Sequence, residues 1–402
     1  MKEDKEILVL GAFDRNNYGD LLFPFIVENQ FNKLMPCAKL SYYGLICSDL
    51  SDIGAKPTLS IKEFYSKCNN KTDNQIIVVI GGGETITASW SGLFAFINNH
   101  FAKVFSVLRK YAWILGLNYV ARFFLGGRTK LPFTFDKNNF DNVDFVFGNS
   151  LGGPGIAKKF FKKYRNARKE LQGIDYLSVR EAQTYHLLES NNIPSFLVPD
   201  SAILMSKIFD YKFLESKISS KIMSFVESNQ YIFFQVKNSI YRQNEDIIIS
   251  ELENIQQTTN LNICLCPIGK ALLHDDQMAL KEIQRKLAVK NVFFDEVSIW
   301  EIMYLIANSE CYVGTSLHGT ITAMSFGRPY VGFNKQIKKL DFYLKQWSIE
   351  QLNECVSPEN ISSSVYMALE VDREMIKQKT KEQIRLVEES FEKMTSFIAS
   401  CS

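Results

Sequence analysis

The chain has 402 residues, and its 46 Lys and Arg nearly balance 44 Asp and Glu, for a formal net charge of +2. A chain so close to neutral does not indicate nucleic acid as an obligate partner. Any anion must therefore be bound by a few cations that lie close together. The length exceeds that of one ordinary core and predicts two domains.

No run of about 18 apolar residues predicts a membrane-spanning helix. The nearest candidate, 111-YAWILGLNYVARFFLGG-127, is interrupted by Asn118 and Arg122, and we interpret it as a buried or interfacial helix. The N-terminus is charged and then strand-like, which predicts no secretory leader. Cys264 and Cys266 have no second pair to complete a zinc site. We therefore expect reduced thiols, no bound metal and a cytoplasmic protein.

Short β-branched runs alternate with helical patterns, which predicts an α/β fold of two Rossmann-like parallel-sheet domains. Strands are expected in the first half at 6–13, 75–80, 142–150 and 174–179, and the segment 196–204 closes this half. In the second half, strands are expected at 230–237, 261–269, 291–296, 311–316 and 329–334. We place the domains at 1–205 and 206–365. The remaining segment, 366–402, is predicted to be helical and to pack back on the body.

In open parallel sheets, ligands bind beyond the carboxyl ends of the strands. The first strand is followed by 11-GAFDRNNYGDLLFPF-25, with a helix expected from about Leu21. Asp20 stands where a helix cap belongs, or else contacts ligand hydroxyls. Asn17 suits hydrogen bonding to a polyhydroxylated ligand.

The second strand end carries three glycines in 81-GGGET-85, which let the backbone approach a ligand. Ile86 occupies the third glycine's place in G-x-G-x-x-G, so a dinucleotide site is disfavoured. Thr85 and Thr87 either hydrogen-bond a ligand or serve in a tight turn.

Arg180 follows a strand that ends at Val179 and falls at the start of a predicted helix. A cation is unfavourable at the positive end of a helix, which suggests an external anion bound by Arg180. A local ion pair with Glu181 is the alternative.

His318 is one of only four histidines and lies between the strand 311-CYVGT and a helix expected at 319–327. It is either a packed structural residue or a group facing a ligand at the strand end. The other three, His100, His186 and His274, are interpreted as surface or packing residues.

Together these segments resemble the polysaccharide pyruvyl transferase family. The matching pieces, in family order, are 17-NYGDLL-22, 81-GGGET-85, S-V-R at 178–180, 198-VPDS-201, 316-SLHG-319 and 327-GRP-329. The resemblance implies a GT-B-like fold with two domains facing across a cleft. It also implies transfer of a pyruvyl group from phosphoenolpyruvate to two sugar hydroxyls as a cyclic ketal, with release of phosphate and no other cofactor.

The resemblance assigns Arg180 and His318 to the donor site, but a second family arginine is replaced by Ser316. Arg328, Lys335 or Lys270 are candidates for the missing cation. The expected donor residues are Arg180, Ser316, His318, Gly319, Thr320, Lys335 and Lys270. The expected acceptor residues are Asn17, Asp20, Gly82, Gly83, Glu84 and Thr85.

A protonated His318 is expected to protonate the methylene carbon of the donor or to hold the departing phosphate. Asp20 or Glu84 is expected to take the hydroxyl proton, so Asp20 joins Arg180 and His318 as a candidate catalytic residue. Replacing Arg180 or His318 with Ala is expected to lower turnover by orders of magnitude while thermal stability changes little.

Two other functions remain open. One is a GT-B-type glycosyltransferase using a nucleotide sugar, although only Lys335 and Asp341 follow the last strand as ribose contacts. The other is a non-catalytic scaffold in polysaccharide assembly. The basic, aromatic segment 157-AKKFFKKYRNARKE-170 is either an ordinary solvated face or a contact with the inner face of a membrane, near a lipid-linked acceptor.

Overall fold

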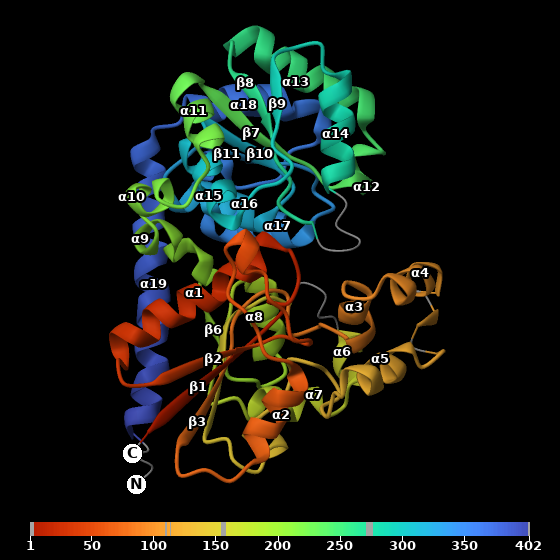
Figure 1. The fold of residues 1–402 in the computed structure, drawn as a ribbon, viewed down its shortest axis with the longest axis vertical. Helices are drawn as coiled ribbons and strands as arrows, with labels where there is room; N and C mark the ends of the chain where they lie inside the picture. The colour runs from red at the N-terminus through yellow and green to blue at the C-terminus, as the bar shows by residue number, and fades with distance from the viewer. Residues whose placement is uncertain (1–3, 109–110, 113, 154–157, 271–275, 401–402) are drawn as a thin grey trace.

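Two parallel sheets form the framework of the protein (Figure 1). The structure is a computed structural model that describes residues 4–108, 111–112, 114–153, 158–270 and 276–400. The N-terminal sheet has the order β2-β1-β3-β4-β5-β6, and the C-terminal sheet has the order β11-β10-β7-β8-β9. The predicted fold class is confirmed: two parallel-sheet α/β domains.

The strands of the N-terminal sheet are β1 (Lys5–Leu10), β2 (Lys39–Tyr43), β3 (Gln75–Ile80), β4 (Phe145–Leu151), β5 (Tyr176–Val179) and β6 (Phe196–Leu197). Those of the C-terminal sheet are β7 (Tyr231–Gln235), β8 (Asn262–Leu265), β9 (Asn291–Phe293), β10 (Cys311–Gly314) and β11 (Tyr330–Gly332). The edge strand β2 was not predicted. Most of its side chains are partly exposed, so it lacks the continuous apolar run of a buried strand.

The helices of the N-terminal half are α1 (Tyr18–Leu34), α2 (Ile61–Asn69), α3 (Trp90–Ala95), α4 (Asn99–Leu108), α5 (Leu117–Leu125), α6 (Lys158–Lys163), α7 (Ala167–Gln172) and α8 (Ala182–Glu189). Those that follow are α9 (Met205–Ile208), α10 (Tyr211–Glu215), α11 (Ser220–Ser228), α12 (Asn238–Tyr241), α13 (Glu245–Thr259), α14 (Asp276–Lys286), α15 (Ile299–Asn308), α16 (Leu317–Ser325), α17 (Lys338–Trp347), α18 (Ile361–Leu369) and α19 (Arg373–Ser400).

Alternate residues of β1 enter two different cores, as the pleat of a strand requires. Leu8 and Leu10 pack on the side of α2, whereas Ile7 and Val9 belong to a larger core that continues through α1 into the C-terminal domain. The two domains therefore share apolar packing on one side of the molecule.

Helix α19 runs along both domains (Figure 1). Thr380 donates a hydrogen bond to the carbonyl of Met324 at 2.7 Å in the C-terminal domain, and Tyr176 of the N-terminal sheet donates to Ser390 at 3.1 Å. Phe391 packs edge-on against Phe31 of α1. Among the described residues, no helix is both long and apolar enough to cross a bilayer.

Candidate active site

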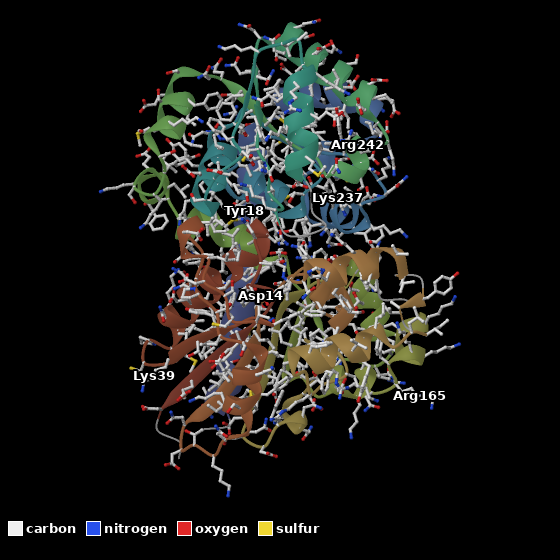
Figure 2. All side chains as sticks on the ribbon, turned by 45° about the vertical axis from the view of Figure 1, so that its right-hand side comes forward. Asp14, Tyr18, Lys39, Arg165, Lys237 and Arg242 are labelled. Atoms are coloured by element: carbon white, nitrogen blue, oxygen red, sulfur yellow. The ribbon has the colours of Figure 1, made fainter. Side chains whose placement is uncertain are left out.

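The carboxyl ends of the two sheets face each other through paired loops. Asn17, after β1, forms an antiparallel bridge with Gly269, after β8. The Tyr18 amide donates to the Ile268 carbonyl at 3.2 Å, and the Lys270 amide donates to the Asn16 carbonyl at 3.0 Å. Figure 2 shows Tyr18 at this junction. The loops at 16–18 and 268–270 are therefore interdomain contacts.

Arg180 is buried beside the junction, with 1% of its surface exposed. Its Nε donates to Glu181 Oε1 at 3.0 Å, and its Nη1 donates to Asp200 Oδ2. Burial disfavours its charge, but the Coulombic attraction of Asp200 and Glu181 outweighs this and raises the pKa of Arg180. Burial alone would also raise the pKa of Asp200, yet Arg180 and His318 lower it to about 2, so Asp200 is ionised.

His318 reaches the same carboxylate from the other domain. Its Nε2 lies 3.5 Å from Asp200 Oδ2, a separation at which a protonated imidazole forms an ion pair. The imidazole packs edge-on to Phe23, and its Nδ1 lies against Gly19, where any side chain would collide with the ring. Only 11% of the side chain is exposed. Arg180 and His318 thus meet at Asp200; we call these three residues and Glu181 the junction cluster.

The burial of Arg180 corrects the prediction that it offers an open anion site. Both of its ion-pair partners are carboxylates of the protein, and the alternative of a local pair with Glu181 is present. Glu181 is itself held by Thr184 and by the Gly153 amide, each at 3.1 Å. A donor anion at Arg180 would have to displace one of these carboxylates, so Arg180 is placed to support Asp200.

The residues around His318 form the start of α16, which begins two residues earlier than predicted. Ser316 is the N-cap, and its hydroxyl accepts from the Gly319 amide at 3.3 Å. Gly319 faces Tyr312 and Ile268 so closely that a side chain would collide with them. Thr320 is fully buried and donates to the Ser316 carbonyl at 3.0 Å. Gly319 and Thr320 make packing and helix contacts within the protein, and their contact with a donor stays a prediction.

The candidates for the missing cation are all engaged elsewhere. Lys335 pairs with Glu354 at 2.9 Å on the surface, and the Lys270 side chain donates to the Asp295 carbonyl. Arg328 donates to the Ala307 carbonyl at 2.5 Å. Because Arg328 precedes β11, it lies at the amino end of the sheet, away from the junction.

On the acceptor side, Asn17 rather than Asp20 is the N-cap residue of α1, because the helix begins at Tyr18. The Asn17 amide donates to Asp20 Oδ2 at 2.7 Å, so Asp20 stands in the first turn, beside Gly83. Predicting the helix start at Leu21 was wrong by three residues.

The glycine triplet makes a tight turn. Gly82 and Gly83 have φ of 126° and 81°, values that favour glycine, and Gly82 also leaves room for Phe23. Thr85 is buried with its hydroxyl directed at the Gly83 carbonyl, which supports the tight-turn alternative over a ligand contact. Glu84 is partly exposed and pairs with Lys339 of α17 at 3.8 Å, across the junction.

Asp200 is the residue that the sequence reasoning missed. It lies in the 198-VPDS-201 segment that matched the family pattern, so its signal was available, but no role was assigned to it. Gly19 and Tyr18 were missed as well. The Tyr18 hydroxyl lies 2.9 Å from Thr322 Oγ1 and ties α1 to α16 under His318.

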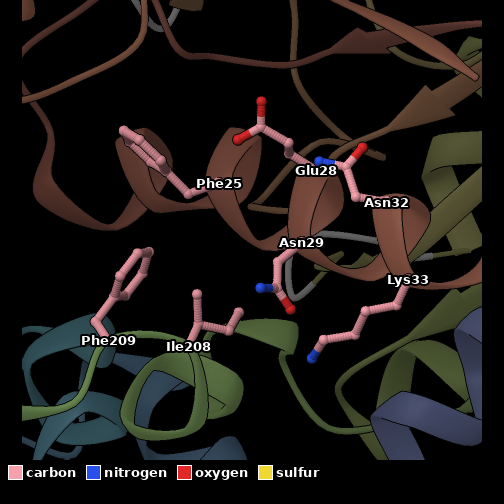
Figure 3. Close-up of a pocket in the computed structure, with 7 residues that line it drawn as sticks. All are labelled: Phe25, Glu28, Asn29, Asn32, Lys33, Ile208 and Phe209. Carbon is pink, nitrogen blue, oxygen red and sulfur yellow. The ribbon is translucent and has the colours of Figure 1, made fainter. Parts of the chain in front are cut away.

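Other features do not add to this site. A groove of about 330 Å³ lies between the second half of α1 and the end of α9 (Figure 3). Its walls include Phe25, Lys33 and Phe209 and none of the junction cluster. In the part of the chain that the structure describes, no group of three or more His, Cys, Asp or Glu is arranged to hold a metal.

The amino-acid sequence of the chain matches one protein family. The sequence profile described as polysaccharide pyruvyl transferase matches residues 17–337, a span that includes every residue of the junction cluster. The chain belongs to the polysaccharide pyruvyl transferase family. Among proteins of curated function, none matches the sequence of this family member.

Solved structures with the same architecture are distant in sequence. A UDP-N-acetylglucosamine 2-epimerase from Rickettsia bellii superposes with a TM-score of 0.58 at 12% identity, covering 99% of this chain and 97% of that one. The S. aureus MnaA–UDP co-structure gives 0.57 at 11% identity, with 98% and 96% covered. A Methanocaldococcus jannaschii UDP-GlcNAc 2-epimerase gives 0.52 at 13%, with 92% and 94% covered. At such identities the likeness shows the fold alone, which is GT-B-like.

Proposed function

We propose that the protein transfers a pyruvyl group from phosphoenolpyruvate to two hydroxyls of a sugar in a surface polysaccharide or its precursor, free or lipid-linked. The methylene carbon of the donor gains one proton and becomes a methyl group. The two hydroxyl oxygens replace the phosphate oxygen at the neighbouring carbon and close a cyclic ketal. The second hydroxyl proton leaves with the phosphate, so atoms and charge balance.

The observation that carries this proposal is the convergence of His318 and Arg180 on Asp200 from separate domains. Without His318, the junction cluster has one cation and two carboxylates, a formal charge of −1. A protonated His318 brings that charge to zero. His318 then serves as the acid for the methylene carbon or as the cation beside the departing phosphate. Arg180 and Glu181 act through Asp200 as positioning residues.

The acceptor side is assigned to the first turn of α1 and the glycine turn. Asp20 carries a carboxylate that is hydrogen-bonded on one oxygen by Asn17, and it stands beside Gly83. We assign it the removal of a hydroxyl proton, with Glu84 as the alternative base. The missing family arginine at Ser316 leaves Lys270, Lys335 and Lys339 as cations that a bound donor would recruit by releasing their present partners.

One assay tests the proposal. The protein is incubated with phosphoenolpyruvate and a panel of sugar acceptors, and phosphate release is followed together with the mass gain of the acceptor. A parallel reaction receives UDP-sugars, and UDP release is measured. Phosphate release with an acceptor mass gain supports pyruvyl transfer, whereas UDP release without it supports the glycosyltransferase alternative. Binding of neither donor by calorimetry supports a scaffold.

The His318→Ala variant assigns the activity to this site. General acid catalysis contributes roughly 10²–10⁴-fold, so turnover is expected to fall by that factor. His186→Ala is the matched control, because His186 is exposed and its ion pair with Glu189, at 3.5 Å, lies on the surface. Near-normal turnover in His318→Ala would remove His318 from the mechanism. Because phosphoenolpyruvate is a cytoplasmic metabolite, we place the reaction in the cytoplasm.

A further inference from the structure

The α4–α5 region exposes apolar side chains to an unusual degree. More than half of the exposed large apolar side chains in the described part of the chain fall within residues 104–124. They are Val104, Val107, Tyr111, Ile114, Leu115, Tyr119, Val120, Phe123 and Phe124, and we call them the apolar lobe surface. Val107, Ile114 and Phe123 are each more than 70% exposed. So many exposed apolar side chains on so short a stretch of chain mark a site of interaction.

Helices α4 and α5, which carry the apolar lobe surface, form a folded lobe of the N-terminal domain. Helix α5 buries Ala121 and Leu125 on its inner face, while its outer face presents Tyr119, Val120, Phe123 and Phe124 at helical spacing. Asn118 accepts a hydrogen bond from the Ser91 amide of α3 at 3.2 Å and so fixes α5 to the domain. Figure 1 shows α4 and α5 projecting from the N-terminal domain. The helix is therefore apolar on two faces and packs only one of them.

Charge near the lobe has a single sign. Residues 85–135 contain no Asp or Glu and six Lys or Arg. Lys103, Arg128 and Lys130 are exposed there. An exposed apolar surface on a stretch of chain whose only charged residues are cations differs from an ordinary solvated face, which mixes both signs.

A second set of cations adjoins the lobe on α6 and α7. Its exposed members are Lys159, Lys162, Lys163, Arg165, Arg168 and Lys169, and we call them the basic face. Figure 2 shows Arg165 at the outer edge of the N-terminal domain. Glu170, the acidic residue of this segment, is buried. Leu131, just after the lobe, packs with Phe160 and Ala167, which ties the basic face to it.

We propose that the apolar lobe surface inserts into the headgroup region of an anionic lipid bilayer while the basic face contacts the lipid phosphates. Aromatic and aliphatic side chains next to Lys and Arg, on a stretch of chain without Asp or Glu, are the composition of an interfacial membrane anchor. A second copy of the chain is a poorer occupant, because it would bring like charges together. The proposal rests on surface composition and does not depend on the chemistry at His318.

Vesicle co-sedimentation of the full chain tests this assignment. The protein is mixed with vesicles of phosphatidylcholine alone or of phosphatidylcholine with phosphatidylglycerol, at low and at high salt. Binding is expected only with phosphatidylglycerol, and it should weaken with salt because the basic face contributes Coulombic attraction. Absence of binding to phosphatidylglycerol vesicles would overturn the proposal.

A pair of double variants separates insertion from charge. Phe123→Glu with Phe124→Glu places two carboxylates in the lobe, and bound protein is expected to fall about tenfold. Met278→Glu with Met367→Glu is the matched control, since both residues are exposed apolar side chains of the C-terminal domain and the charge change is equal. Circular dichroism confirms that each variant folds.

Two results would contradict insertion. If both double variants lost vesicle binding equally, the loss would reflect net charge and not insertion. If the unmodified chain were a dimer and the lobe variant a monomer, the surface would bind a second copy of the chain. Pyruvyl transfer to a free sugar should be unchanged in the lobe variant, so failure of this proposal and failure of the proposed function are distinguishable.

Discussion

Charged side chains usually lie on the surface of a protein and apolar side chains in its core. The junction cluster places charged side chains inside, whereas the apolar lobe surface places apolar side chains outside. At the junction, Arg180, Glu181 and Asp200 are buried, and these three and the mostly buried His318 are linked by ion-pair distances. On the lobe, apolar side chains meet solvent, and no described part of the chain covers them. Ion pairs inside the protein hold the side chains of the junction cluster in fixed positions, as a catalytic site needs. An apolar face that the chain leaves uncovered is typical of a surface that contacts a partner.

The largest expected effect comes from breaking the junction cluster at its cation. Arg180→Met leaves Glu181 and Asp200 as buried carboxylates without a guanidinium, which should lower the free energy of unfolding by about 3–5 kcal/mol. Chemical denaturation measures this. This predicted loss of stability replaces the expectation from the sequence that replacing Arg180 changes stability little.

Lys335→Met is the matched control for this measurement. Its ion pair with Glu354 is more than half exposed on both sides, so its loss should have almost no effect on stability. Similar unfolding midpoints for the two variants would mean that Arg180 is not structurally essential, and direct contact with a donor would again be favoured.

The sequence predicted the architecture well because buried parallel strands leave continuous apolar runs. Runs such as 75–80 and 311–314 were found in this way. The exposed edge strand β2 was not, and the starts of α1 and α16 were misplaced by two or three residues, since caps depend on backbone geometry rather than on pattern.

Side-chain burial at the site was less predictable. The sequence identified Arg180 and His318 and placed each at a strand end, but it could not show that Asp200 stands between them. Partners distant in the chain decide whether an arginine is open to a ligand or saturated by carboxylates. The sequence showed that 111–127 is apolar. It could not show which face of α5 is exposed, because that depends on which face packs against the domain.

Asp276 provides a contrast with Asp200 and the next prediction. Both carboxyls are buried, but Asp276 Oδ2 accepts hydrogen bonds from Gln235 at 2.8 Å and from the Gly269 amide at 3.0 Å rather than pairing with a cation among the described residues. Burial raises the pKa of Asp276 to about 7, although these hydrogen bonds and Lys237 oppose the shift.

This shift fixes how stability depends on pH. Between about pH 4 and pH 7, the unfolded chain has released the proton that folded Asp276 retains, so stability falls as pH rises and then levels. Asp276→Asn has no proton to release. Its stability relative to the unmodified protein should therefore rise across this window, by on the order of 2–4 kcal/mol. Parallel pH profiles of thermal unfolding would contradict this.

The smallest expected effect lies on the apolar lobe surface and tests whether its two faces differ as described. Phe123→Ser removes a side chain that is 74% exposed, so the free energy of unfolding should change by less than about 0.5 kcal/mol. Leu125→Ala, two residues away on the buried face, should cost about 2–5 kcal/mol because it leaves a cavity. If Phe123→Ser were as destabilising as Leu125→Ala, Phe123 would be covered within the chain itself. The lobe would then have no free apolar face to offer a bilayer.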